Sequence, residues 1–168
     1  MTRRGFTIVE LVITITVMGI LLLLAVVNVG STQANARDDE RVADIEAIGN
    51  ALERYYKTGT DTSTTFNRYP TTDALSSVEL IKSNLLDIDI KSFQAPGLTD
   101  TNAVSLVMAT TNIQTGSSSP QPSITEYVYQ PLRGDGLLCT QTTECRKFNL
   151  YYRLESGATI YKVMSKNQ

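Results

Sequence analysis

The feature that most constrains this chain is an apolar run near its N-terminus that carries a single charge. Residues 8–27 are free of Lys, Arg and Asp, and they contain one Glu, Glu10. As a helix these 20 residues would be about 30 Å long, which matches the hydrocarbon core of a bilayer. A carboxylate in hydrocarbon costs about 2.5–3.5 kcal/mol, so it marks a function and needs a partner. Because no Lys or Arg lies between Glu10 and Arg37, we expect that partner to come from outside the segment.

The run can be interpreted as a secretory signal or as a membrane anchor. Arg3 and Arg4 precede it, and this placement predicts a cytoplasmic N-terminus. The small-residue pattern Ala34-Asn35-Ala36 is typical of a signal cleavage site. A secreted binding protein cut after Ala36, or an uncut single-pass anchored one, is therefore one hypothesis. Against it, the run exceeds the usual signal core of about 7–15 residues, and Glu10 fits such a core poorly.

The residues ahead of the run carry a more specific pattern. The order Gly5-Phe6-Thr7-Ile8-Val9-Glu10, followed by an apolar helix, resembles the processing site of type IV prepilins and pseudopilins. The resemblance implies a leader of residues 1–5, cleavage after Gly5 by a prepilin peptidase, and methylation of the new amine on Phe6. It also implies that the Glu10 carboxylate neutralises the Phe6 amine of an adjacent subunit during filament assembly. Opposite charges attract strongly where the dielectric is low.

The same resemblance implies where the protein acts and with what. The subunit would first span the cytoplasmic membrane with its N-terminus inside, and then enter a cell-surface or extracellular filament. Its partners would be other pilin subunits, the prepilin peptidase and an inner-membrane assembly platform. Major pilin, minor pilin and secretion pseudopilin remain open. Many pilins carry a Pro at the position of Val27; here the weak helix formers Asn28 and Gly30 are the candidates for a soft point.

The helical pattern continues beyond the apolar run. Val42, Ile45, Ile48 and Leu52 recur at steps of three and four, which predicts one apolar stripe. Together the two patterns predict one helix from Phe6 to about Lys57. Its residues 6–29 would form the membrane and filament-core part, and its residues 30–58 an amphipathic part packed on a head. We expect the charged residues of the second part on the solvated faces: Arg37, Asp38, Asp39, Glu40, Asp44, Glu46 and Glu53.

The remaining sequence predicts a small α+β head. Residues 59–123 indicate a region of loops with a short helix at 77–86, capped by Ser76 or Ser77, and a strand at 103–110. Residues 124–168 indicate an antiparallel sheet with strands at 124–132, 147–154 and 158–164. A long helix packed on such a sheet is the α/β roll expected of a pilin head.

Cys139 and Cys145 bracket a short loop within the sheet region. In an exported chain these cysteines are expected to form a disulfide, while reduced thiols and half of a metal site are the alternatives. A zinc site is disfavoured because the chain has no His and two further ligands would have to be carboxylates. The disulfide would pin a local loop.

Several function classes are disfavoured by composition. Without His, the commonest general base and metal ligand are missing, so we expect a non-enzymatic protein that needs no cofactor. Asp87 and Asp89 are too few for a calcium site. The net charge of −2 argues against nucleic-acid binding. The tyrosines of the sheet region are accordingly interpreted as packing residues: Tyr127, Tyr129, Tyr151, Tyr152 and Tyr161.

Overall fold

The computed structural model describes residues 5–58, 67–98, 103–114, 118–139 and 143–167. For residues 26–29 and 58 only the backbone is described. The predictions for most of the leader, for the helix stop at Gly59 and for the middle of the Cys139–Cys145 loop lie outside these residues. By its contacts the chain divides into two units, residues 1–36 and 37–168, and the second unit is called the head below.

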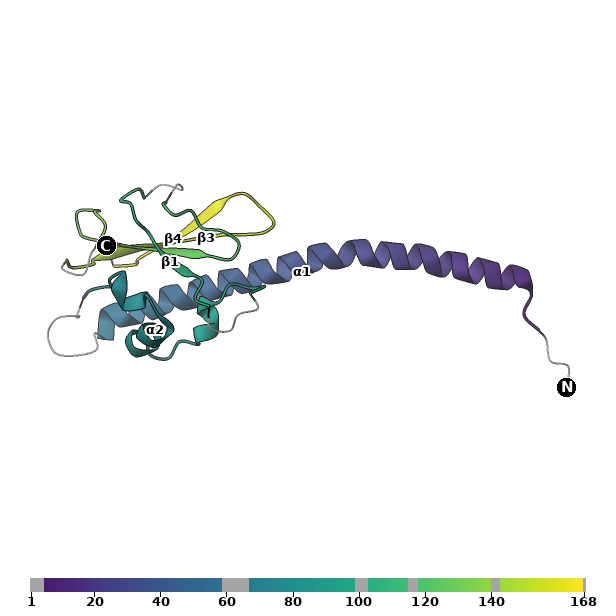
Figure 1. The fold of residues 1–168 in the computed structure, drawn as a ribbon, viewed down its shortest axis with the longest axis horizontal. Helices are drawn as coiled ribbons and strands as arrows, with labels where there is room; N and C mark the ends of the chain where they lie inside the picture. The colour runs from purple at the N-terminus through teal and green to yellow at the C-terminus, as the bar shows by residue number, and fades with distance from the viewer. Residues whose placement is uncertain (1–4, 59–66, 99–102, 115–117, 140–142, 168) are drawn as a thin grey trace. The chain divides into compact units, whose positions relative to one another are not determined.

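One long helix, α1, runs from Ile8 to Thr58 (Figure 1). This confirms the prediction of a continuous helix, which begins two residues after Phe6. Within residues 8–25 every side chain is exposed, whereas the part from Arg37 onward belongs to the head and supplies part of its core. A helix with exposed apolar residues on all sides is suited to a bilayer or to a bundle of other helices.

The head contains a four-stranded sheet in the order β1-β2-β3-β4 (Figure 1). Its strands are β1 Leu106–Met108, β2 Tyr127–Leu132, β3 Lys147–Arg153 and β4 Ile160–Met164. β2, β3 and β4 pair antiparallel, as expected. β1 pairs parallel to β2, a pairing that was not predicted, so the sheet as a whole is mixed. The crossover between β1 and β2 carries the chain through residues 109–126.

Short helices lie in the part of the chain that connects α1 to the sheet. The predicted helix is present as α2, Val78–Asn84, and Ser77 is its cap because its hydroxyl accepts the N–H of Leu80. Two 3₁₀ turns, η1 at Asp73–Leu75 and η2 at Ile90–Phe93, were not predicted. The side chain of Asp89 accepts the N–H of Lys91 and so caps η2, which gives this carboxylate a structural role.

The core lies between the head part of α1 and one face of the sheet. Ile45, Ile48 and Leu52 are buried there, as the apolar stripe predicted. They join Tyr127 and Tyr129 in one cluster. The opposite face of the sheet holds a smaller cluster around Val128 and Tyr151. Three of the five tyrosines are therefore fully buried, and the prediction of packing residues is confirmed for them: Tyr127, Tyr129 and Tyr151.

The charged residues of α1 do not all face solvent, which corrects one expectation. Asp38, Asp44 and Glu53 are buried, with 6–9% of each residue exposed, and Arg41 is 1% exposed. Asp39, Glu40 and Glu46 are exposed as expected. Helical periodicity identifies the apolar face of a helix but does not show which polar residues at its border become buried. In this head the charged residues at the border are covered by other segments of the chain.

Candidate assembly site

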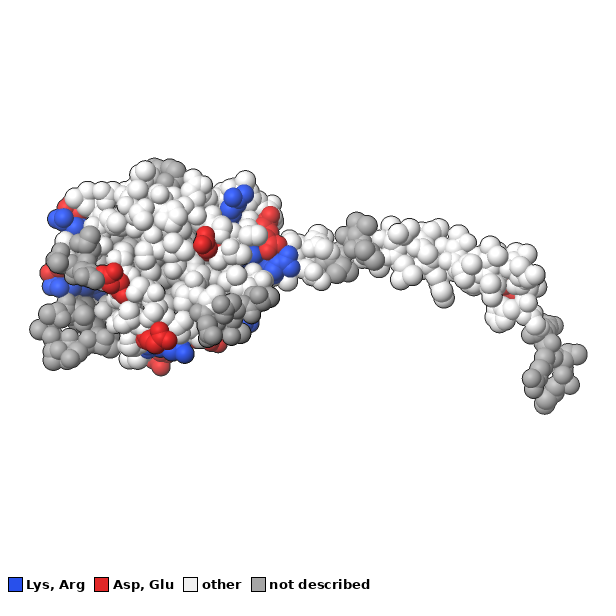
Figure 2. Space-filling view, in the orientation of Figure 1, with Lys and Arg blue, Asp and Glu red and all other residues white. Residues whose placement is uncertain are grey.

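The segment that carries the processing motif is fully exposed. Phe6 is 84% exposed and Ile8 83% exposed, and the large apolar side chains as far as Leu24 are also open. In Figure 2 the described part of this segment is white except for one acidic patch, which agrees with Glu10 as its only charge. By length and composition α1 contains one stretch apolar enough to cross a membrane. The described residues of the chain do not cover this surface.

Glu10 already has a partner within its own helical turn. Thr7 precedes the first helical residue, and its N–H and hydroxyl donate to the Glu10 carboxylate at 3.1 and 3.0 Å. The Glu10 N–H donates back to the Thr7 hydroxyl at 3.3 Å. This reciprocal arrangement is a capping box, which satisfies backbone donors that otherwise have no acceptor at a helix N-terminus.

The capping box supplies neutral partners that were not predicted, and the expectation of a cation from outside residues 8–27 stays a prediction. The sequence carried the signal, because Thr-x-x-Glu directly before an apolar run is typical of a helix start. The contacts hold the carboxylate beside the helix N-terminus, where the partial positive charge of the helix also favours an anion. They involve neutral donors, so a cation is still absent from the surroundings of Glu10 among the described residues.

Other polar groups of the apolar part are satisfied locally as well. The hydroxyl of Thr14 donates to the carbonyl of Leu11 at 2.8 Å, and that of Thr16 donates to the carbonyl of Val12 at 2.7 Å. In hydrocarbon an unsatisfied hydroxyl is costly, so such back-bonding makes both threonines compatible with a bilayer. Glu10 is then the one group of the segment 5–25 whose charge is not balanced.

In the head, Arg41 links α1 to three other segments. Its guanidinium donates to the carbonyls of Ile124 and Pro96 at 2.9 and 3.4 Å. It also pairs with Asp38 at 3.0 Å and with Glu155 at 2.7 Å. A charge that is 1% exposed is tolerated because its donors meet carbonyls and carboxylates.

Two further contacts complete this cluster at the turn between β3 and β4. The Asp38 carboxylate accepts the N–H groups of Glu155 and Ser156 at 2.7 and 3.0 Å. Arg37 binds the Glu155 carboxylate through two nitrogens, at 2.9 and 2.7 Å. Hydrogen bonds from Arg37 and then Arg41 lower the pKa of Glu155 to about 2. Burial opposes ionisation of Asp38, but the backbone N–H groups of Glu155 and Ser156, with the Ser156 side chain and the charge of Arg41, together lower the pKa of that carboxyl.

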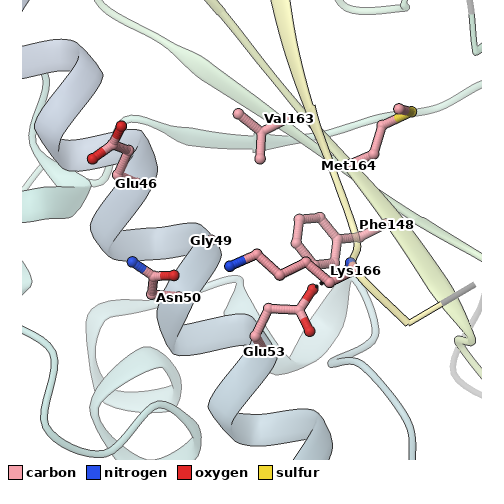
Figure 3. Close-up of a pocket in the computed structure, with 8 residues that line it drawn as sticks. All are labelled: Glu46, Gly49, Asn50, Glu53, Phe148, Val163, Met164 and Lys166. Carbon is pink, nitrogen blue, oxygen red and sulfur yellow. Dashed lines mark hydrogen bonds between the residues drawn. The ribbon is translucent and has the colours of Figure 1, made fainter.

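At its other end, the head part of α1 holds the C-terminal segment through Glu53. The carboxylate accepts the N–H of Lys166 and the amide of Asn167, each at 2.7 Å, and the hydroxyl of Tyr69 at 3.1 Å. A hollow of about 360 Å³ lies beside it, between α1 and β4 (Figure 3). In that view Glu46 and Asn50 border the hollow from α1, and Val163 borders it from β4.

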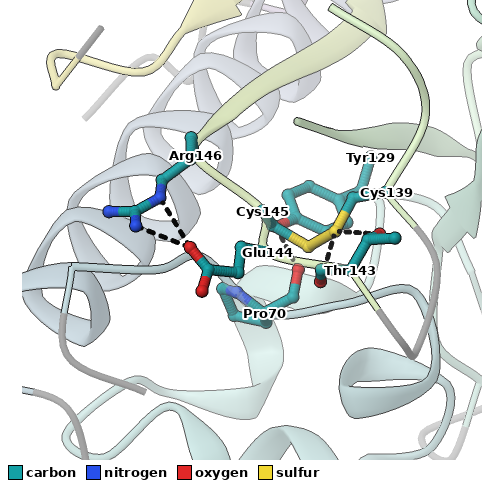
Figure 4. The surroundings of a disulfide bond; sticks show 7 residues. All are labelled: Pro70, Tyr129, Cys139, Thr143, Glu144, Cys145 and Arg146. Atoms are coloured by element: carbon teal, nitrogen blue, oxygen red, sulfur yellow. Dashed lines mark hydrogen bonds and ion pairs between the residues drawn. A yellow bond between two sulfur atoms is a disulfide. The ribbon is translucent and has the colours of Figure 1, made fainter. Parts of the chain in front are cut away.

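The predicted disulfide is present, between Cys139 and Cys145 (Figure 4). Both cysteines are buried. The carbonyl of Cys145 accepts the N–H of Tyr69, and the hydroxyl of Tyr129 donates to the carbonyl of Pro70 at 2.8 Å. The disulfide loop therefore packs against the chain that follows α1. Among the described residues no group of three or more His, Cys, Asp or Glu is placed to hold a metal ion.

Comparison with known proteins agrees with the motif. Residues 1–26 match the family model of the prokaryotic N-terminal methylation motif. The chain is 38% identical over 71 residues to the type II secretion system core protein G of Aeromonas hydrophila, which covers 42% of this chain and 45% of that protein. The corresponding protein of Klebsiella michiganensis is 39% identical over 72 residues, covering 43% and 46%. That of Escherichia coli K12 is 38% identical over 53 residues, covering 32% and 37%.

The matches are partial. The chain spans less than half the length of each of these relatives, and no solved structure matches it significantly. The resemblance drawn from the residues between Gly5 and Glu10 is nevertheless confirmed at the level of the motif. The chain carries the prokaryotic N-terminal methylation motif and is similar to the core protein G of type II secretion systems.

Proposed function

We propose that this protein is a structural subunit of a type IV pilus-like filament. The match of residues 1–26 to the methylation motif, on a helix whose apolar side chains are all exposed through residue 25, carries the proposal. Burying a Leu or Ile side chain contributes about 1.5–3 kcal/mol, so helices that leave the membrane and bundle can hold a long polymer. The names of the three relatives favour a filament of the type II secretion kind over a surface pilus.

Processing would prepare Glu10 for its final partner. A prepilin peptidase cuts after Gly5 and leaves a methylated amine on Phe6, and the Glu10 carboxylate of a neighbouring copy then pairs with that amine. Before assembly the capping box with Thr7 holds the carboxylate within its own copy. The exchange replaces neutral donors by a cation in a low dielectric, where a hydrogen-bonded ion pair is strong. Glu10 would thereby fix the axial register between copies.

Two substitutions of Glu10 separate its charge from its capping role. Glu10→Ala removes both, whereas Glu10→Gln keeps a side chain that can cap at this position. We expect both variants to be made and inserted and neither to form filaments, as measured by the yield of sheared fibres. Wild-type yield from Glu10→Gln would show that capping suffices and would overturn the charge role.

N-terminal sequencing of the mature chain tests the proposal itself. Methylated Phe6 supports a filament subunit. A chain that begins at Arg37 would support a secreted protein cut after Ala36, and one that begins at Met1 or Thr2 would support an uncut membrane anchor. The pilin-type partners, the assembly platform and the peptidase follow only from the first result.

A further inference from the structure

We propose that the exposed face of α1 within the head forms a second contact between parallel copies, in which the acidic end of one copy meets the basic end of its neighbour. This inference rests on the filament function proposed above and names a further interface within it. The face is called the α1 stripe, and it consists of Asp39, Ala43, Glu46, Asn50, Arg54 and Lys57.

The α1 stripe is one continuous line on the helix. Its members follow one another at steps of three and four residues, which places them on a single face. All six are exposed, whereas Ile45, Ile48 and Leu52 on the opposite side are buried in the core. The stripe is therefore the side of the head helix that the described part of the chain leaves uncovered.

Charge is segregated along the stripe. Asp39 and Glu46 lie in its first half, and Arg54 and Lys57 lie at its end. The nearest opposite charges of the stripe, on Glu46 and Arg54, are eight residues apart, which is about 12 Å along a helix and too far for a direct pair. Asp39, Glu46 and Lys57 also take no part in the ion pairs found among the described residues.

A second copy can pair these charges. If a parallel copy is shifted by about 13 residues, or about 20 Å, Lys57 of one helix lies near Glu46 of the other. The same shift brings Arg54 near Asp39. Each pair is then within about two residues of perfect register, about 3 Å, which long side chains bridge.

Two features of the surroundings suit such a contact. Ala43 and Asn50 are short, so two helices can approach closely at the stripe. Glu46 and Asn50 also border the hollow beside β4, so the acidic end has open space next to it (Figure 3). The parallel arrangement follows from the proposed function, because copies inserted in one membrane have their N-termini on the same side.

A charge swap tests the stripe. Glu46→Lys and Lys57→Glu each place like charges together, and each is expected to lower the yield of sheared fibres about tenfold or more. The double variant restores opposite charges and is expected to return the yield to within about threefold of wild type. Lys82→Glu is the matched control, because Lys82 is exposed on α2 and undergoes the same change of charge.

The outcomes separate this contact from the filament function. A wild-type fibre yield from either single variant would contradict the contact through the α1 stripe. So would a double variant whose yield does not recover. In both cases the wild-type chain would still form filaments, so the proposed function would be unaffected. A disulfide formed between two copies of Asn50→Cys would indicate helices that are antiparallel or parallel without a shift, and either arrangement would also overturn the contact. Absence of filaments from the wild-type chain would instead refute the proposed function. Circular dichroism of each variant confirms that the head is folded, as expected for exposed positions.

Discussion

The two parts of α1 obey the same helical geometry but differ in what completes them. From Ile8 to residue 25 every side chain is exposed, and the surface is apolar on all sides. From Arg37 to Lys57 one face is buried in the head, and the exposed face is mostly polar. The second part is stabilised within one chain, whereas the described residues offer the first part no apolar partner. We infer that folding of the head and assembly of the filament depend on separate sets of residues.

The charged groups of the two parts differ in the same way. Glu10 is held by Thr7, three residues away on the same turn. Arg41 is held by groups from residues 38, 96, 124 and 155. A charged group held only by a local contact can change its partner without disturbing the rest of the molecule. A contact that joins four segments cannot, because breaking it leaves buried charges unpaired.

The largest expected effect on stability is therefore at Arg41. Arg41→Ala removes the cation between two carboxylates, one of them the buried Asp38, and leaves the carbonyls of Pro96 and Ile124 without their donor. We expect the free energy of unfolding to fall by about 3–5 kcal/mol. Chemical denaturation of the full chain in detergent micelles, followed by near-ultraviolet circular dichroism, measures it.

Lys57→Ala is the control for Arg41→Ala. It removes an exposed charge from the same helix and is expected to change stability by no more than about 0.5 kcal/mol. A loss below about 1 kcal/mol in Arg41→Ala would show that the cluster does not fasten the β3–β4 turn to α1.

A matched pair of truncations compares the two parts of α1 directly. Ile48→Ala empties a fully buried site in the head and is expected to cost about 2–5 kcal/mol of stability. Leu21→Ala removes a side chain that is 60% exposed, so head stability should stay within about 0.5 kcal/mol of wild type. Fibre yield, in contrast to head stability, should fall in Leu21→Ala. A destabilised head in Leu21→Ala would mean that the two parts are coupled.

The sequence predicted those elements whose signals are local. The helical period of Ile45, Ile48 and Leu52 predicted the core face of α1, and a serine at 76 or 77 ahead of an apolar pattern predicted the start of α2. Tyr127 and Val128 lie on opposite faces of β2, as the alternation of side chains along a strand requires. In each case the pattern that predicts the element lies within a few neighbouring residues of the sequence.

The features that were missed depend on distant parts of the chain. The segment around β1 was predicted as a strand, but its parallel pairing with β2 depends on the path of residues 109–126. The burial of Arg41 depends on carbonyls 55 and 83 residues away. The capping box of Thr7 and Glu10 is different. Its signal, Thr-x-x-Glu, is local, but the prediction for Glu10 considered only the charge of the carboxylate.

A smaller effect on stability is expected from the disulfide loop. Cys139→Ala with Cys145→Ala opens a loop of six residues' separation, and closure of so short a loop contributes about 2 kcal/mol. The loop packs against Tyr69 and Pro70, so the loss should appear in the head. Equal denaturation midpoints for the wild type and the double variant would show that packing alone holds the loop. Fibre yield at temperatures well below unfolding should be unchanged.

The smallest expected effect is a gain in stability at Asp44. Burial raises the pKa of this carboxyl to about 6, although the hydroxyl of Tyr127 donates to it at 3.1 Å and acts in the opposite direction. Glu40 raises the pKa further, while Lys91 and Arg41 lower it. In the unfolded chain the pKa is near its ordinary value of 3.8. The ionised form is therefore disfavoured by folding.

The sign of the pH dependence follows from these two values. Below about pH 4 the carboxyl is protonated in both states and costs nothing; as the pH rises through about 6 the folded state loses stability. Asp44→Asn removes this loss and keeps an acceptor for Tyr127. It should stabilise the head by about 1–2 kcal/mol at pH 7 and change its stability little at pH 4.

Glu155, whose pKa is lowered to about 2, acts in the opposite sense and contributes stability that is lost as the pH falls below about 4.5. It does so equally in both proteins, so the difference between their denaturation curves isolates Asp44. A difference that is independent of pH, or a destabilised variant at pH 7, would show that Asp44 is ionised at no cost in the folded head.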